Sequence, residues 1–279
     1  MAGFLGFFDY SKPGPGIPKN APPKARLIVF FEIFFRKFWN LVKINMLFSI
    51  FNIPSVFAMF LALMFFFPNI INNQTSGFIE KIVFGIAILC IPLITVGPAQ
   101  SGFTYILRNY AREEHAFIWS DFKEHALKNL RQSLIVCLID FIIVVLIGFT
   151  INFYMSFDRS NTLMAFASGI VILAFIVFLM MHLYIYPIMV TFKLKLRQIY
   201  KNAFLFSLIK FIPNFLILLL CFVIIYASFY FYVIGFMLLP FITFSFIGLI
   251  TNFYSYGKLK KYMIDKVDNE SSIEIRNPN

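Results

Sequence analysis

The chain has 279 residues, of which 60% are hydrophobic, 20% aromatic and only 13% charged. A soluble fold of this length could not cover its core with so little polar surface, so the composition excludes a soluble protein and indicates an integral membrane protein. The net charge of +11 is spread in short basic blocks between apolar runs. This distribution favours contact with the anionic headgroups of an inner leaflet and argues against nucleic acid as a partner.

Residues 1–26 are polar and rich in proline and glycine, and we expect an extended cytoplasmic segment here rather than a cleaved signal. The next stretch, residues 27–44, repeats large apolar side chains at helical spacing and places Glu32 and Arg36 on another face. These two residues stand four apart with the acid first, which is the favourable order for an ion pair within a helix. We therefore predict an amphipathic helix in the inner membrane interface.

Six apolar runs are long enough to cross the hydrocarbon core of a bilayer, which takes about 20 helical residues. The fold class is therefore predicted to be all-α, a polytopic membrane helical bundle with about six transmembrane helices and interfacial amphipathic helices. The last two spans divide one long apolar run at Tyr230, Tyr232 and Gly235. The predicted spans are residues 45–67, 82–106, 133–155, 163–190, 211–230 and 233–256.

The basic residues are distributed very unequally among the connecting segments. Of the 24 Lys and Arg, 22 lie in the N-terminal region, in residues 108–131, in residues 191–210 and in the C-terminal tail, and two lie in the alternate loops. The positive-inside rule then places both termini and the two long loops in the cytoplasm. This divides the chain into the cytoplasmic segment 1–26, a transmembrane domain 27–256 and a cytoplasmic tail 257–279.

A basic amphipathic stretch precedes each pair of predicted spans, at residues 27–44, 117–131 and 192–209. This order predicts three structural hairpins, each introduced by an interfacial helix. Internal repetition is one explanation of the pattern, and the alternative is chance similarity in a chain with 40 Phe.

Several short stretches resemble the YesL-like family of bacterial membrane proteins, which is also described as domain of unknown function number 624. They are FFDYSKPGPG at 7–16, FFEIFFRKFW at 30–39, GPA at 97–99, REEHAFIWSDF at 112–122 and KNA at 201–203. The resemblance implies a multi-pass protein of the bacterial plasma membrane, commonly encoded near carbohydrate-uptake transporters, whose permease subunits would be its partners. It implies no reaction. Lys12 is a family-pattern position without a further assignment. The other family-pattern positions are also the candidates for cytoplasmic interaction, namely Glu32, Arg36, Arg112, Glu113, Glu114, His115, Trp119 and Asp121.

The run Arg112 to His115 has two interpretations, an acid–base or metal cluster and a solvated helical face. Adjacent acids on a helix point in different directions, and no second group of ligands follows at a suitable spacing, so the solvated face is preferred. If the loop is helical, Trp119 and Phe122 share a face with His115. The sequence contains no catalytic motif, and we expect a protein that is not an enzyme and uses no metal or cofactor.

Four polar residues within the predicted spans are the intramembrane candidates. Asp140 and His182 are ionisable, and at 1.5 Å per residue they lie about 13 and 16 Å from the cytoplasmic boundary. We therefore expect them to face each other between the third and fourth spans. Asn52 and Gln100 lie at a similar depth. Such residues either form a polar layer lining a path for protons or small solutes, or make hydrogen bonds between helices.

Two classes of function follow from these features. One is a non-enzymatic accessory or regulatory component associated with carbohydrate uptake, which the charge asymmetry and the family resemblance favour. The other is a small-solute channel or transporter built around the polar layer.

Overall fold

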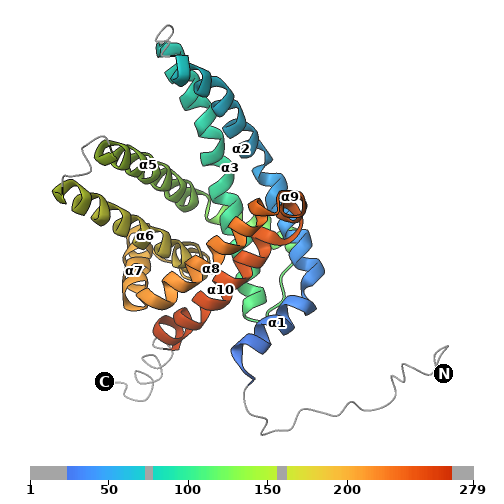
Figure 1. Cartoon of the computed structure of the whole chain (residues 1–279). Coiled ribbons are helices and arrows are strands. Elements are labelled where there is room, and N and C mark those ends of the chain that lie inside the picture. The colour runs from blue at the N-terminus through green and yellow to red at the C-terminus, as the bar shows by residue number, and fades with distance from the viewer. Residues whose placement is uncertain (1–23, 73–77, 156–161, 266–279) are drawn as a thin grey trace, which may run out of the picture.

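The computed structural model describes residues 24–72, 78–155 and 162–265. Every regular element in these ranges is helical, which confirms the predicted all-α class (Figure 1). The helices are α1 (Arg26–Arg36), α2 (Phe38–Asn72), α3 (Phe78–Ala111), α4 (Ile118–Lys128), α5 (Leu130–Met155), α6 (Thr162–Thr191), α7 (Leu196–Ile209), α8 (Phe211–Tyr230), α9 (Tyr232–Leu238) and α10 (Phe244–Leu259). Two π-helical segments, η1 (Leu239–Thr243) and η2 (Lys260–Ile264), flank α10. Residues 1–23, with Lys12 among them, and most of the predicted tail lie outside the described residues.

In the part of the chain that the structure describes, four helical stretches are long and apolar enough to cross a membrane, so the chain has the features of a multi-pass membrane protein. They are Phe38–Leu61, Leu130–Ile151, Thr162–Thr191 and Phe211–Tyr230. The two other predicted spans, 82–106 and 233–256, are helical but do not belong to this set. The first lies within α3, and the second is divided by η1, which leaves α10 with only 16 residues.

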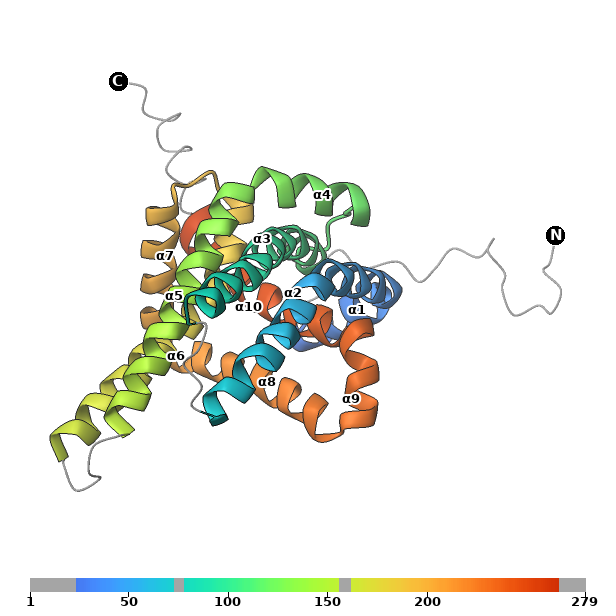
Figure 2. The same cartoon turned by 90° about the horizontal axis from the view of Figure 1, so that it is seen from above.

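The helices form three hairpins, and a short helix precedes each one. Helix α1 leads into α2–α3, α4 into α5–α6, and α7 into α8 with α9–α10. Helices α3, α6 and α10 contact one another, and from this common base α2–α3 points upward in Figure 1 while α5–α6 points to the left. Seen from above, α1, α4 and α7 lie around the periphery (Figure 2). The three predicted hairpins are thus present, whereas repetition of the sequence itself stays a prediction.

The turn between α8 and α9 confirms the predicted division of the last apolar run. Helix α8 ends at Tyr230, and α9 begins at Tyr232. Gly235 returns the chain so closely onto α8 that a Cβ atom at this position would overlap the backbone of Ser228. Glycine is required here because only its missing side chain allows two backbones to approach in this way.

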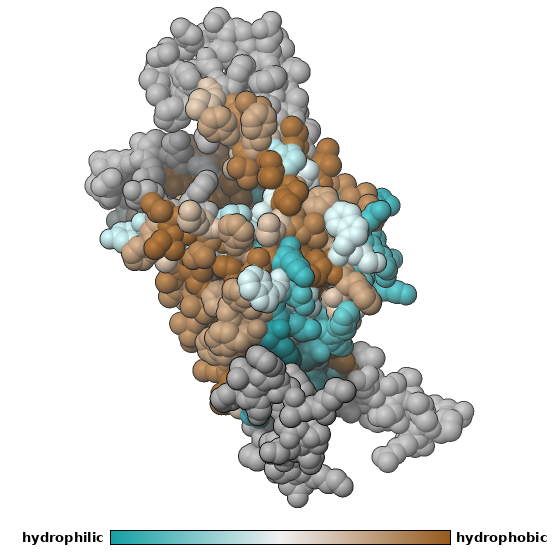
Figure 3. All heavy atoms as spheres, turned by 90° about the vertical axis from the view of Figure 1, so that its right-hand side faces the viewer, coloured by the Kyte–Doolittle hydropathy of each residue, from teal (hydrophilic) through white to brown (hydrophobic). Residues whose placement is uncertain are grey.

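Burial is concentrated toward the base of the bundle. All buried residues of α6 lie between Met180 and Val190, and Ile44 and Ile106 of the first hairpin form a core with Leu249 of α10. Gly102 adds to this packing, since a Cβ atom there would lie 2.5 Å from the carbonyl oxygen of Phe122 in α4. On the coloured part of the face shown in Figure 3, hydrophobic residues predominate above and to the left, and hydrophilic residues gather below and to the right. This division is typical of an apolar membrane-embedded part above a polar base.

Candidate functional site

Asp140 in α5 and His182 in α6 face each other, as the sequence predicted. The carboxylate oxygen Oδ1 of Asp140 lies 3.0 Å from Nε2 of His182, and both side chains are 27% exposed. His182 Nδ1 lies 3.0 Å from the backbone carbonyl oxygen of Phe178, which can only accept a hydrogen bond, so Nδ1 carries a proton. A second proton must then lie between Nε2 and Oδ1, on either partner. The pair as a whole is therefore electrically neutral, which suits a position within a membrane span.

Among the described residues, no hydrogen bond connects Asn52 or Gln100 to the Asp140–His182 pair. The amide nitrogen of Asn52 donates to the carbonyl oxygen of Phe48 at 2.7 Å, and that of Gln100 lies 3.5 Å from the hydroxyl of Thr104. Both bonds stay within one helix. Within the described ranges, these two side chains therefore make no hydrogen bond between helices, because a neighbouring turn of the same helix supplies their partners.

Two buried asparagines that the sequence reasoning missed make the interhelical contacts instead. Asn45 in α2 donates to the carbonyl oxygen of Leu239 at 2.8 Å and accepts from the backbone N–H of Ser245 at 2.7 Å. It thereby satisfies backbone groups beside the π segment that contains Pro240. An amide one or two turns inside an apolar run is the sequence signal that could have identified Asn45.

Asn214 in α8 joins four elements through one fully buried amide. Its Oδ1 accepts from the hydroxyls of Tyr184 at 2.6 Å and Tyr254 at 2.7 Å, which belong to α6 and α10. Its Nδ2 donates to the carbonyl oxygens of Phe206 at 2.8 Å and Ser207 at 3.1 Å. Those carbonyls lie in the last turn of α7, where no residue of the same helix can satisfy them.

The REEH motif, residues 112–115, forms a turn. The preferred interpretation, a solvated face of a helix, is therefore wrong in its helical conformation. Helix α3 ends at Ala111, and Glu113 has a φ of 60°, a left-handed conformation that stops the helix. Glu113 and Glu114 lie at this turn, and each pairs with a different arginine. Glu113 pairs with Arg36 of α1 at 2.5 Å, and Glu114 pairs with Arg112 at 2.8 Å.

The predicted ion pair between Glu32 and Arg36 is also wrong. Glu32 contacts Lys24 at 2.5 Å, while Arg36 reaches across to Glu113. An exposed pair within a helix contributes only about 0.3–0.5 kcal/mol, so a partner offered by the tertiary structure easily replaces it. The result is a contact between α1 and the turn that precedes α4.

The aromatic part of the motif belongs to the start of α4. Asp121 accepts a hydrogen bond from the backbone N–H of Phe117 at 2.8 Å and so satisfies a group at the helix end. Trp119 is 59% exposed, whereas Phe122 is buried against Phe51. His115 precedes α4 and contacts Phe117, so it does not share a helical face with Trp119 as predicted.

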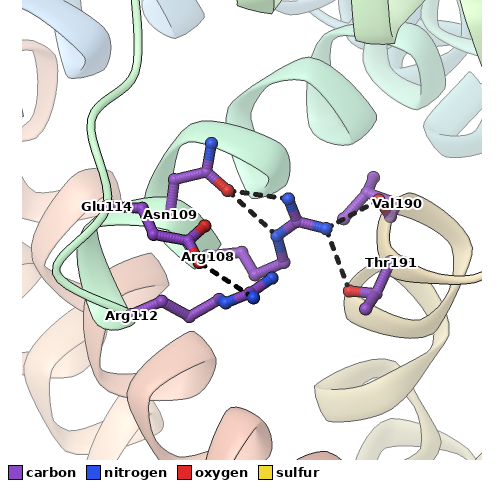
Figure 4. A network of polar contacts seen from close by, with 6 residues as sticks. All are labelled: Arg108, Asn109, Arg112, Glu114, Val190 and Thr191. Atoms are coloured by element: carbon purple, nitrogen blue, oxygen red, sulfur yellow. Dashed lines mark hydrogen bonds and ion pairs between the residues drawn. The ribbon is translucent and has the colours of Figure 1, made fainter. Parts of the chain in front are cut away.

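Arg108, at the end of α3, is the centre of a polar network at the base (Figure 4). Its Nη1 donates to the carbonyl oxygen of Val190 at 2.8 Å and to the hydroxyl of Thr191 at 3.3 Å, both at the end of α6. Its Nε and Nη2 donate to Oδ1 of Asn109 at 3.1 and 2.7 Å. A cation suits this place because the carbonyl end of α6 is partly negative. Burial, and then the nearby Arg112, lower the pKa of Arg108.

We expect the stability of the folded protein to depend on pH through His125. Its ring stacks on Tyr105 with 3.3 Å between ring centroids, and burial lowers its pKa below the ordinary 6.5, with smaller contributions from Lys128 and Arg108. The unfolded chain therefore binds this proton more readily than the folded protein. Stability is fully present above pH 6.5 and decreases as the pH falls below it. We expect the unfolding temperature to fall between neutral pH and about pH 5.

His125→Gln is expected to remove part of this decrease, and thermal unfolding of the purified protein across that pH range measures it. His115→Gln is the matched control, because His115 is exposed in the preceding turn. Equal pH profiles for the two variants would contradict the assignment to His125.

The comparisons with known proteins agree with the resemblance in the sequence. No curated protein and no solved structure matches the chain. Residues 41–153 match the model of a family described as "Protein of unknown function, DUF624", and this segment extends from α2 to α5. It contains the REEH turn, Arg108 and Asp140. Over this segment the chain is similar to the DUF624 family, a family of proteins of unknown function.

Proposed function

We propose that this chain is a non-enzymatic accessory or regulatory component of a carbohydrate-uptake system in the bacterial plasma membrane. It crosses the membrane six times and keeps both termini in the cytoplasm. Its partners are an anionic inner leaflet and the permease subunits of a sugar transporter. The family resemblance supports the association with carbohydrate uptake, and the division of basic residues, 22 against two, supports the orientation.

The observation that carries the proposal is the exposure of the outer half of the α5–α6 hairpin. Phe149 is 72% exposed, and Leu163 and Phe166 are 70% and 71% exposed. Within the candidate span Leu130–Ile151 of α5, only 6% of the most apolar stretch is buried by the rest of the chain. The hairpin therefore presents a large apolar surface at membrane depth to which the spans of another protein can pack.

The six-span topology makes a prediction of its own. In a cysteine-free background, single cysteines at residues 75, 159 and 232 are expected to react with a membrane-impermeant maleimide added from outside, because the loops around them are poor in basic residues. A cysteine at Lys123, in the basic loop, is the matched control and should react only after the membrane is opened. Labelling of any of the three from the cytoplasm alone would overturn the topology.

Photo-crosslinking in native membranes tests the partner. A photoreactive amino acid at Phe149 or Phe166 is expected to capture permease subunits of a sugar transporter. The control position is Leu208, which is 45% exposed on α7 at the base of the bundle. Capture of lipid alone at both outer positions, under conditions in which the transporter is present, would contradict the accessory role.

A second candidate function, proton-linked transport of a small solute, is favoured by the Asp140–His182 pair. A neutral pair that shares a proton between two sites within a span has the chemistry of a proton relay. Purified protein in liposomes with a trapped pH-sensitive dye would then move protons in response to an imposed membrane potential. Asp140→Asn should abolish this flux, and no flux from the unaltered protein would exclude this candidate.

A further inference from the structure

Arg108 and Arg112 bring two guanidinium groups together at the base of α3. Figure 4 shows both side chains extending from the end of this helix toward the end of α6 and the turn at Glu114. All four hydrogen bonds of Arg108 go to uncharged acceptors, namely the amide of Asn109, the carbonyl of Val190 and the hydroxyl of Thr191. The donors of Arg108 are thus satisfied, but in the described part of the chain no carboxylate forms an ion pair with its guanidinium group.

Arg112 still has an unused donor. One of its terminal nitrogens, Nη2, lies 2.8 Å from Glu114, and its guanidinium carbon lies 5.4 Å from the centroid of the Tyr256 ring in α10. Its Nε is buried and has no hydrogen-bond partner among the described residues. Buried N–H groups are normally satisfied, so an orphan donor on a cation indicates a missing acceptor.

A third arginine, Arg26, lies beside Gly257 of α10, which follows Tyr256 in the chain. Arg26 donates from Nη2 to the carbonyl oxygen of Phe253 at 3.1 Å, and a Cβ atom at Gly257 would lie 2.5 Å from the same nitrogen. Its acceptor is again uncharged. Among the described residues, Glu114 is the one carboxylate that forms an ion pair with any of these three arginines. The base of α3 and α10 therefore has an excess of positive charge.

We propose that Arg112, with the charge of Arg108 behind it, binds the phosphate group of an anionic ligand at the cytoplasmic surface of the membrane. The planar guanidinium fork matches the oxygens of a phosphate, and a partly desolvated arginine is a stronger donor than an exposed one. The phosphate belongs either to a phospholipid headgroup or to a soluble compound in the cytoplasm. The site goes beyond the accessory function and does not depend on it.

The ligand is tested with the full-length protein in nanodiscs, by thermal unfolding. In neutral phosphatidylcholine, inorganic phosphate is compared with chloride at matched ionic strength. In a second arm, phosphatidylglycerol replaces part of the neutral lipid. A rise in the unfolding temperature with inorganic phosphate identifies a soluble source, and a rise only with phosphatidylglycerol identifies a lipid headgroup. No rise in either arm would overturn the proposal.

Four variants assign the effect to this site. Arg112→Gln is expected to weaken binding about tenfold or more, and Arg112→Lys to restore it in part, because lysine keeps the charge without the fork. Glu114→Gln should strengthen binding, since it releases Arg112 from its pair, and this variant keeps the test valid if Arg112→Gln does not fold. Arg36→Gln is the control with the same loss of charge at an exposed ion pair. Equal losses in Arg112→Gln and Arg36→Gln, or no gain in Glu114→Gln, would contradict the proposal.

Discussion

Replacing Asn214 with alanine is expected to lower the free energy of unfolding by about 3 kcal/mol or more. The amide is completely buried and makes four hydrogen bonds. Its removal takes the common acceptor from the hydroxyls of Tyr184 and Tyr254 and the donor from two carbonyls of the last turn of α7. Each unsatisfied buried group costs about 1–3 kcal/mol, although water can reach part of the new space.

Asn52→Ala is the matched control for this prediction. It removes the same side chain from another span, but its one hydrogen bond, to Phe48, lies within its own helix. We expect a change below about 0.5 kcal/mol, as for substitutions that leave no buried group unsatisfied. Unfolding titrations in mixed micelles measure both variants. A similar loss for Asn52→Ala and Asn214→Ala would show that the four-element contact has no special role.

Replacing His182 with leucine is expected to destabilise the protein by about 3 kcal/mol, because Asp140 is then left within a span without its partner. Protonation of the lone carboxyl would reduce this cost at low pH. The double variant Asp140→Leu with His182→Leu should recover most of the lost stability, since no ionisable group remains. A double-mutant cycle over the four proteins measures the coupling between the two side chains.

Asp140→Asn separates stability from function at the same position. The amide can donate to Nε2 of His182, so the fold should be retained within about 1 kcal/mol. Thr150→Leu, which removes a hydroxyl bonded within α5, is the control for changing polarity in this span. If Asp140→Asn unfolds the protein, or if the double leucine variant is no more stable than His182→Leu, the neutral-pair account is wrong.

Much of the architecture followed from the sequence alone. Apolar runs of the length of a bilayer can only become helices in a membrane, because no other continuous element satisfies its own backbone there. The three hairpins, each with its preceding short helix, and the turn at Gly235 were predicted on this basis. The Asp140–His182 pair was predictable for a related reason, since a short connection makes adjacent helices antiparallel and the helical rise sets the depth of each residue.

The polar contacts at the base were decided by the tertiary structure. Glu32 and Arg36 have the right spacing for a pair, yet each found another partner, because the free-energy difference between alternative exposed ion pairs is too small for local spacing to determine the choice. The REEH turn required the left-handed backbone of Glu113, which no periodicity indicates. Asn45, Arg108 and Asn214 became central only because the ends of distant helices left carbonyls beside them. Which carbonyls those are depends on the packing of whole helices, and sequence periodicity does not contain that information.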